Sequence, residues 1–109
     1  MPYTANKDER YLEQIYDEVM EEFVRDLEIK KESLEKENFK KLKLDIKKEA
    51  YGSKLNAQCY KEKIDYEVQE IQHTVKKLED NIAVIQDAIQ YLKINRETLL
   101  KEFSEKLPK

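Results

Sequence analysis

The sequence predicts an all-α fold: an antiparallel helical hairpin or coiled coil that turns at Gly52. Three observations predict it. Apolar residues recur at alternating steps of four and three over residues 64–103, which is the 3.5-residue repeat of a coiled-coil seam. Charged residues make up 41% of the 109 residues, as is typical of long helices. The chain has one Gly and two Pro, so the turn residues that sheets need are scarce.

The repeat over residues 64–103 is interrupted by one charged side chain, Arg96. β-branched residues at the first core position of the heptad are compatible with parallel dimers, whereas Ile at the second favours trimers or tetramers. We expect Arg96 to reach the edge of the seam or to meet Asp8 or Glu9. The predicted coiled-coil seam consists of Ile64, Val68, Ile71, Val75, Leu78, Ile82, Ile85, Ile89, Leu92, Leu99 and Phe103.

The first helix is predicted over about residues 7–51, after a flexible N-terminal lead of residues 1–6. Asn6 is a favourable N-cap, and Glu9 stands three residues later, as a capping box requires. The apolar residues that follow form an arc wider than one neighbouring helix needs. Its predicted core stripe is Leu12, Ile15, Val19, Phe23 and Leu27, and its second stripe is Tyr16, Met20 and Val24.

Gly52 is the predicted turn, because glycine suits the left-handed residue that ends a helix. With Ser53 as a possible cap, the second helix is predicted over about residues 53–106. It ends before Pro108, which cannot continue a helix, and leaves residues 107–109 as a tail. Residues 7–106 would then form a single helical-hairpin coiled-coil domain.

The spacing of the apolar residues favours this turn. A chain that folds back at Gly52 places Leu12 opposite Leu92 and Ile15 opposite Ile89, so apolar residues of the two helices meet. The alternative is one long unbroken helix in a parallel assembly, with Gly52 inside it at a cost of about 1 kcal/mol relative to Ala.

An isolated hairpin of this length leaves much apolar surface in water, so we expect it to assemble. Two hairpins side by side make a four-helix bundle. The sequence therefore predicts a homodimer or a heteromeric bundle with another helical protein, built as a four-helix bundle or a larger coiled-coil oligomer. The predicted oligomer or partner interface is Tyr16, Met20, Val24, Val84, Tyr91 and Ile94.

No residue pattern points to catalysis, a cofactor or a metal ion. His73 and Cys59 are each the single residue of their type, and both fall at outward heptad positions. Glu70 precedes His73 by three residues, the spacing of a di-iron motif, but such a site needs two motifs. We therefore expect no catalytic residues, no cofactor and no enzyme activity.

The net charge of −3, with both signs interspersed, does not suggest direct nucleic-acid binding. The densest basic stretch, residues 40–48, is interpreted as a solvated helix face. No apolar run approaches the ~20 residues of a membrane span. A lone cysteine and a start unlike a signal peptide favour a cytoplasmic protein.

The seven tyrosines include a group near the turn, namely Tyr51, Tyr60 and Tyr66. Exposed tyrosines are frequent in interfaces, so this group is either a binding patch or simple packing around the turn. The predicted function is a non-enzymatic coiled-coil module for protein–protein interaction, acting as a scaffold, adaptor or subunit of a larger assembly. The alternative is a small acidic helical regulator or inhibitor of a protein or nucleic-acid-processing machine.

Overall fold

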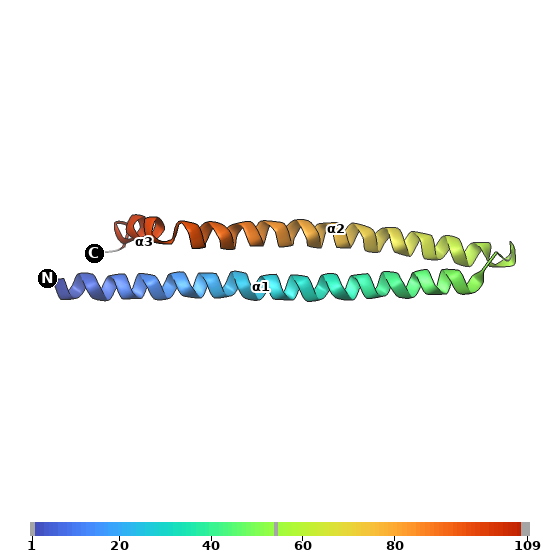
Figure 1. Cartoon of the computed structure of the whole chain (residues 1–109), viewed down its shortest axis with the longest axis horizontal. Coiled ribbons are helices and arrows are strands. Elements are labelled where there is room, and N and C mark those ends of the chain that lie inside the picture. Colours follow the sequence, from blue (N-terminus) through green and yellow to red (C-terminus); the bar gives the residue numbers. More distant parts are fainter. Residues whose placement is uncertain (1, 54, 108–109) are drawn as a thin grey trace. The chain divides into compact units, whose positions relative to one another are not determined.

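The computed structural model describes residues 2–53 and 55–107, with side chains from Arg10 onward. Its elements are α1 (Pro2–Tyr51), the short 3-10 helix η1 (Leu55–Ala57), α2 (Gln58–Ile94) and α3 (Arg96–Ser104), and the described residues contain no strand. The chain reverses direction between α1 and α2 (Figure 1). The predicted all-α helical hairpin with its turn at Gly52 is therefore confirmed.

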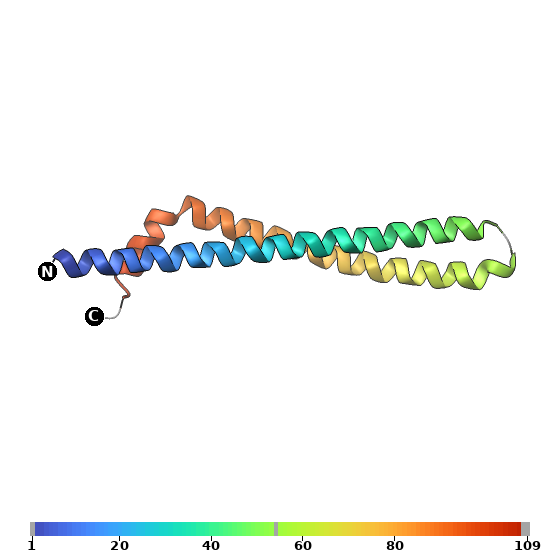
Figure 2. The same cartoon turned by 90° about the horizontal axis from the view of Figure 1, so that it is seen from below.

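Contacts divide the chain into two compact units, and both long helices contribute to each. We call Met1–Glu28 together with Val84–Lys109 the terminal unit, and Ile29–Ala83 the turn unit. Within each unit, α1 runs beside the returning chain in the opposite direction (Figures 1 and 2). The two units are described separately below.

The reversal in the turn unit depends on Gly52. Its φ angle is +63°, in the left-handed region that residues with a Cβ avoid. Its N–H donates to the carbonyl oxygen of Glu49 at 3.1 Å, which closes the end of α1. The turn is longer than predicted, because η1 follows it and α2 begins at Gln58 rather than near Ser53.

The core of the turn unit is a single apolar seam. Ile64 and Ile82 are buried, and the seam residues between them are half-buried. Ala57 of η1 is also buried, so η1 closes the seam at the turn. No side chain with a polar or charged group is buried among the described residues, as expected where two helices share one apolar stripe.

The core of the terminal unit keeps Leu12, Phe23 and Leu27 of the predicted stripe of α1 but has Tyr16 and Met20 in place of Ile15 and Val19. Ile15 and Val19 are 40% and 38% exposed. Opposite them in the unit, Ile85 and Ile89 of α2 are buried and Leu92 is half-buried. The inner face of α1 in this unit consists of the half-buried residues Leu12, Tyr16, Met20, Phe23 and Leu27.

The second long helix does not continue to residue 106 as predicted. α2 ends at Ile94, and α3 begins after Asn95 (Figure 2). Phe103, predicted in the seam, is 46% exposed, whereas Leu100 and Ser104 are half-buried. The break redirects the chain, so the heptad phase that placed Phe103 inside does not hold beyond it.

The pairing of facing residues also differs from the expected one. Leu12 lines a pocket together with Leu100, not with Leu92. The expected pairing assumed a sharp reversal at Gly52, but the turn extends through η1 to Ala57. Tyr16 likewise contacts Leu92 and Arg96, which have higher numbers than a sharp reversal at Gly52 would place opposite it.

The first helix begins at Pro2, ahead of the start expected at Lys7. Residues that the sequence analysis assigned to an N-terminal lead are thus part of α1. The expected capping box at Asn6 and Glu9, and the expected contact of Arg96 with Asp8 or Glu9, lie outside the described side chains.

Candidate functional site

The groups that most often carry chemistry are solvent-facing and isolated in this structure. His73 is exposed on α2, and Cys59 is an exposed free thiol. Across residues 2–53 and 55–107, no three His, Cys, Asp or Glu residues gather in a way that could hold a metal ion. Within those ranges, no helix combines the length and the apolar character of a membrane span.

The most specific side-chain arrangement lies in the terminal unit and is built around Tyr16. The hydroxyl of Tyr16 donates a hydrogen bond to the backbone carbonyl oxygen of Leu92, across the seam. In a continuous helix that oxygen would accept the N–H of Arg96. Because α2 stops at Ile94, the Tyr16 hydroxyl supplies a donor that the broken helix needs.

Asn95 forms the break itself. Its φ and ψ angles are −104° and 16°, in the sparsely populated bridge region rather than the helical one. Its side-chain amide donates to the carbonyl oxygen of Tyr91 at 3.0 Å, and its backbone N–H donates to the same oxygen at 3.0 Å. Such bonding from Asn to the preceding turn competes with regular helix geometry.

Arg96 completes this cluster. Its guanidinium carbon lies 5.6 Å from the centre of the Tyr16 ring, a cation–π contact. Burial raises the pKa of the Tyr16 hydroxyl, and the charge of Arg96 offsets part of that effect. The hydroxyl therefore stays protonated at neutral pH and remains a donor to Leu92.

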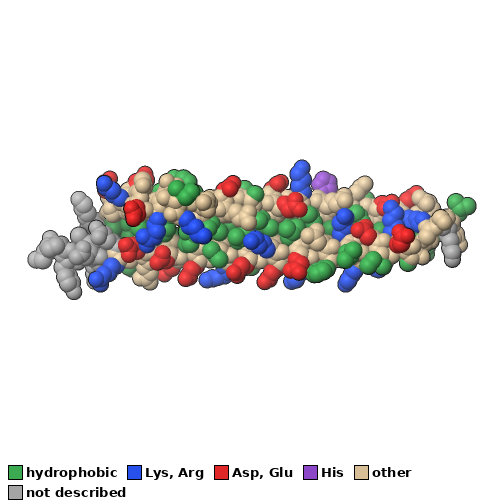
Figure 3. Space-filling view, viewed as in Figure 1, with side chains coloured by type: hydrophobic (Ala, Val, Ile, Leu, Met, Phe, Trp, Pro, Cys, Tyr) green, Lys and Arg blue, Asp and Glu red, His purple; other side chains and the backbone are tan. Residues whose placement is uncertain are grey.

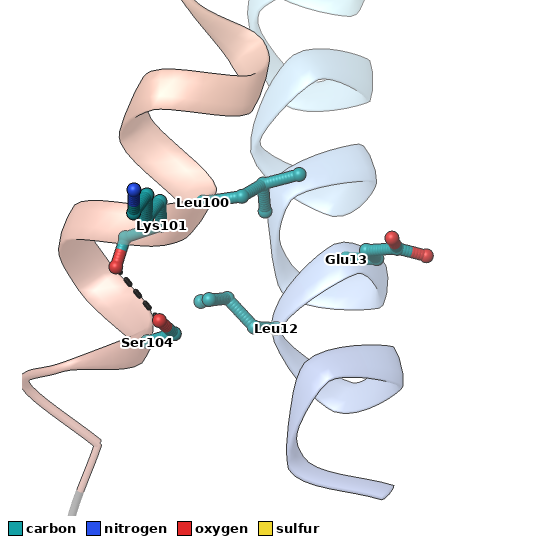
Figure 4. Close-up of a pocket in the computed structure, with 5 residues that line it drawn as sticks. All are labelled: Leu12, Glu13, Leu100, Lys101 and Ser104. Carbon is teal, nitrogen blue, oxygen red and sulfur yellow. Dashed lines mark hydrogen bonds between the residues drawn. The ribbon is translucent and has the colours of Figure 1, made fainter. Parts of the chain in front are cut away.

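Beside this cluster, α1 and α3 frame a small open pocket (Figure 4). Leu12 and Leu100 point toward each other across it, while Glu13 points away. The hydroxyl of Ser104 donates to the carbonyl oxygen of Lys101 at 2.7 Å, so its proton is already used in a hydrogen bond within α3. The pocket is open to solvent and is lined by two apolar and three polar residues, unlike the enclosed and mostly apolar cavities that bind small molecules.

Four exposed apolar side chains lie on one side of the terminal unit. Ile15 and Val19 lie one turn apart at one edge of the inner face of α1. Val84 and Tyr91 of α2 are 67% and 58% exposed. Viewed down each helix from its own N-terminus, these residues are all rotated in the same direction away from the face that meets the other helix. When two helices run antiparallel, residues rotated in the same direction lie on the same side of the pair. Helix geometry thus places Ile15, Val19, Val84 and Tyr91 along the same side of the unit, and we call them the terminal apolar face.

The six residues of the predicted interface do not share one surface. Tyr16 and Met20 are half-buried on the inner face of α1. Val24 is 39% exposed at the opposite edge of that face from Ile15, and Ile94, 70% exposed, projects on the side of α2 away from α1. Val84 and Tyr91 remain in the terminal apolar face. The sequence did not show which of the two α1 stripes packs inward, because both have helical spacing.

A second apolar surface in the turn unit escaped the sequence analysis. Phe39, Leu42 and Ile46 are 55%, 54% and 62% exposed. They stand at spacings of three and four along α1, so they form one stripe on its outer side. That spacing was visible in the sequence, but the stripe could not be told from a core stripe without knowing which face meets α2.

The tyrosines near the turn separate into a pair and a single residue. The rings of Tyr51 and Tyr60 stack with centres 5.4 Å apart and planes inclined by 13°. Tyr66 is 63% exposed, and Glu70 raises the pKa of its hydroxyl through a hydrogen bond and through its negative charge. The pair bridges α1 and α2, as does the ion pair of Lys48 with Asp65 at 2.6 Å. The Tyr51–Tyr60 contact thus has a packing role in the turn unit.

Comparison with known proteins adds no assignment. No protein-family model matches the chain, no curated protein matches it, and no solved structure matches it.

Proposed function

We propose that the protein is a non-enzymatic protein–protein interaction module, which assembles with a second copy of itself through the terminal apolar face. The observation that carries the proposal is the exposure of Val84 and Tyr91, at 67% and 58%, on the same side as Ile15 and Val19. Large apolar side chains grouped on one side of a helix pair are typical of surfaces that bind other helices.

The thin core supports the same proposal. Five apolar residues in the described part of the chain are buried, and none of its larger side chains is fully buried. Burying a Val, Leu or Ile side chain contributes about 1.5–3 kcal/mol. A second hairpin laid on the terminal apolar face would bury the remaining exposed surface of Ile15, Val19, Val84 and Tyr91. In this function the protein serves as a scaffold, adaptor or subunit of a larger assembly.

The test is the molar mass of the purified chain by light scattering over a range of concentrations. We expect a dimer that dissociates on dilution. Replacing Val84 with Glu places a charge in the interface, so we expect the dissociation constant to rise at least tenfold, the equivalent of about 1.4 kcal/mol.

Ile94→Glu is the matched control. Ile94 is as exposed as Val84, at 70%, and also lies on α2, but it projects on another side of the helix. We expect the Ile94 variant to dimerise like the unaltered chain. A folded monomer at all concentrations, or equal loss of dimer in both variants, would contradict the assignment of this face to self-association.

A further inference from the structure

We propose that residues 96–104 exchange between two arrangements: the broken one in this structure, and one in which α2 runs on through Asn95 without interruption. Asn95 and Tyr16 together would hold the broken arrangement. This inference rests on the helix break alone and does not depend on the proposed function.

The heptad repeat supports the continuous arrangement. Leu92, Leu99 and Phe103 keep the spacing of the residues before them, with Arg96 as the one exception. A helix without a break would carry Phe103 onto the inner side of α2. In the structure, Phe103 is instead 46% exposed, and Leu100 takes the place beside Leu12. The same segment thus has an apolar residue available for the inner side in either arrangement.

The carbonyl oxygen of Leu92 has a hydrogen-bond donor in both arrangements. In the broken arrangement, the carbonyl oxygen of Leu92 accepts the hydroxyl of Tyr16. In a continuous helix it would accept the N–H of Arg96 instead. The carbonyl is satisfied in each case, so neither arrangement leaves it without a donor, which would otherwise cost about 1–3 kcal/mol.

The two arrangements differ in what they present at the surface. The broken one exposes much of Phe103 and stacks Arg96 on the ring of Tyr16. The continuous one would turn Phe103 inward and release the Tyr16 hydroxyl. A partner that binds the Phe103 ring would therefore favour the broken arrangement.

Amide hydrogen exchange measured by NMR distinguishes the two directly. The N–H groups of Arg96, Glu97 and Thr98 begin α3, where no earlier helical carbonyl is in place for them. The Asn95 side chain makes no capping bond to them. We expect these three amides to exchange fast in the unaltered chain. In a continuous helix they would be bonded to Leu92, Lys93 and Ile94 and would exchange slowly.

Asn95→Ala removes the amide that bonds to Tyr91 and introduces the best helix former. Tyr16→Phe removes the hydroxyl that occupies the Leu92 carbonyl but keeps the ring beside Arg96. We expect each change to slow exchange at Arg96, Glu97 and Thr98 about tenfold.

Thr74→Ala is the control, because the Thr74 hydroxyl makes a similar bond to the carbonyl oxygen of Glu70 at 3.2 Å, within the unbroken part of α2. We expect it to leave the three amides unchanged. If Tyr16→Phe loosens the terminal unit as a whole, Asn95→Ala decides the outcome, because the Asn95 amide hydrogen-bonds to Tyr91 within its own helix. Fast exchange in Asn95→Ala as in the unaltered chain would overturn the proposal, as would three amides already protected in the unaltered chain.

Discussion

The same heptad repeat runs through the turn unit and the terminal unit, yet the helix that carries it is continuous in the first and broken in the second. In the turn unit, α2 stays continuous and is tied to α1 by the stacked rings of Tyr51 and Tyr60 and by an exposed ion pair. In the terminal unit, Asn95 and Arg96 interrupt the apolar repeat, and the helix breaks there. Tyr16 reaches across the seam to the freed carbonyl.

The comparison shows that apolar periodicity limits which faces of a helix can be buried, but does not decide whether the helix stays continuous. Continuity depends on local hydrogen-bond competition at a single residue and on a donor from the facing helix. Hydrophobic side chains still reach the surface along the C-terminal part of α2 (Figure 3). The terminal unit therefore combines a specific polar contact with exposed apolar surface.

The largest expected effect comes from substitutions in the two cores, which test whether the two units share one folding transition. Ile64 of the turn unit and Ile89 of the terminal unit are both buried, at 7% and 8% exposure. Replacing either with Ala should lower the free energy of unfolding by about 2–5 kcal/mol, because a cavity remains in a narrow seam. Urea denaturation followed by circular dichroism measures this.

Amide hydrogen exchange then shows which unit each substitution destabilises. If the units unfold separately, Ile64→Ala raises exchange only in the turn unit and Ile89→Ala only in the terminal unit. Equal increases in both units from either variant would mean that the hairpin unfolds as one. Leu55→Ala is the control, since Leu55 is 93% exposed and its loss should leave the stability unchanged.

A smaller effect is expected at the turn. Gly52→Ala should destabilise the turn unit by about 1–2 kcal/mol, because φ is positive there and a Cβ strains the backbone. A Cβ at this position would meet no atom within 4 Å, so crowding adds nothing. Gly52→Asn should cost less than Gly52→Ala, because Asn adopts the left-handed region more readily. Thermal unfolding of both variants measures the difference, and equal losses would argue against backbone strain as the cause.

The smallest expected effect is the pH dependence that Tyr16 gives to the stability of the terminal unit. The pKa of Tyr16 is raised in the folded chain, so the folded state holds this proton more tightly than the unfolded state does. Its contribution is complete below pH 10 and declines as the pH rises through the folded pKa. The free energy of unfolding, measured by urea denaturation, should therefore fall more steeply above pH 10 in the unaltered chain than in Tyr16→Phe. Identical slopes would show that the hydroxyl contributes nothing to this unit.

The amino-acid sequence favoured an all-α hairpin with its turn at Gly52 over one unbroken helix, and it predicted the seam residues from Ile64 to Leu92. These follow from periodicity and from the conformational freedom of glycine, which are local properties. Asn95 carried a recognisable signal as a poor helix former next to Arg96, but the apolar repeat on both sides of it favoured a continuous helix.

Three features became visible only in the folded chain: the packing of Tyr16 and Met20 inward in place of Ile15 and Val19, the pairing of the helices, and the position of the break in the second helix. Tyr16 and Ile15 both have helical spacing, and the contact of Tyr16 with Leu92 and Arg96 places Tyr16 on the inner face. The pairing of Leu12 with Leu100 depends on the length of the turn through η1. These features depend on atoms that are far apart in the chain, so a local pattern could not specify them.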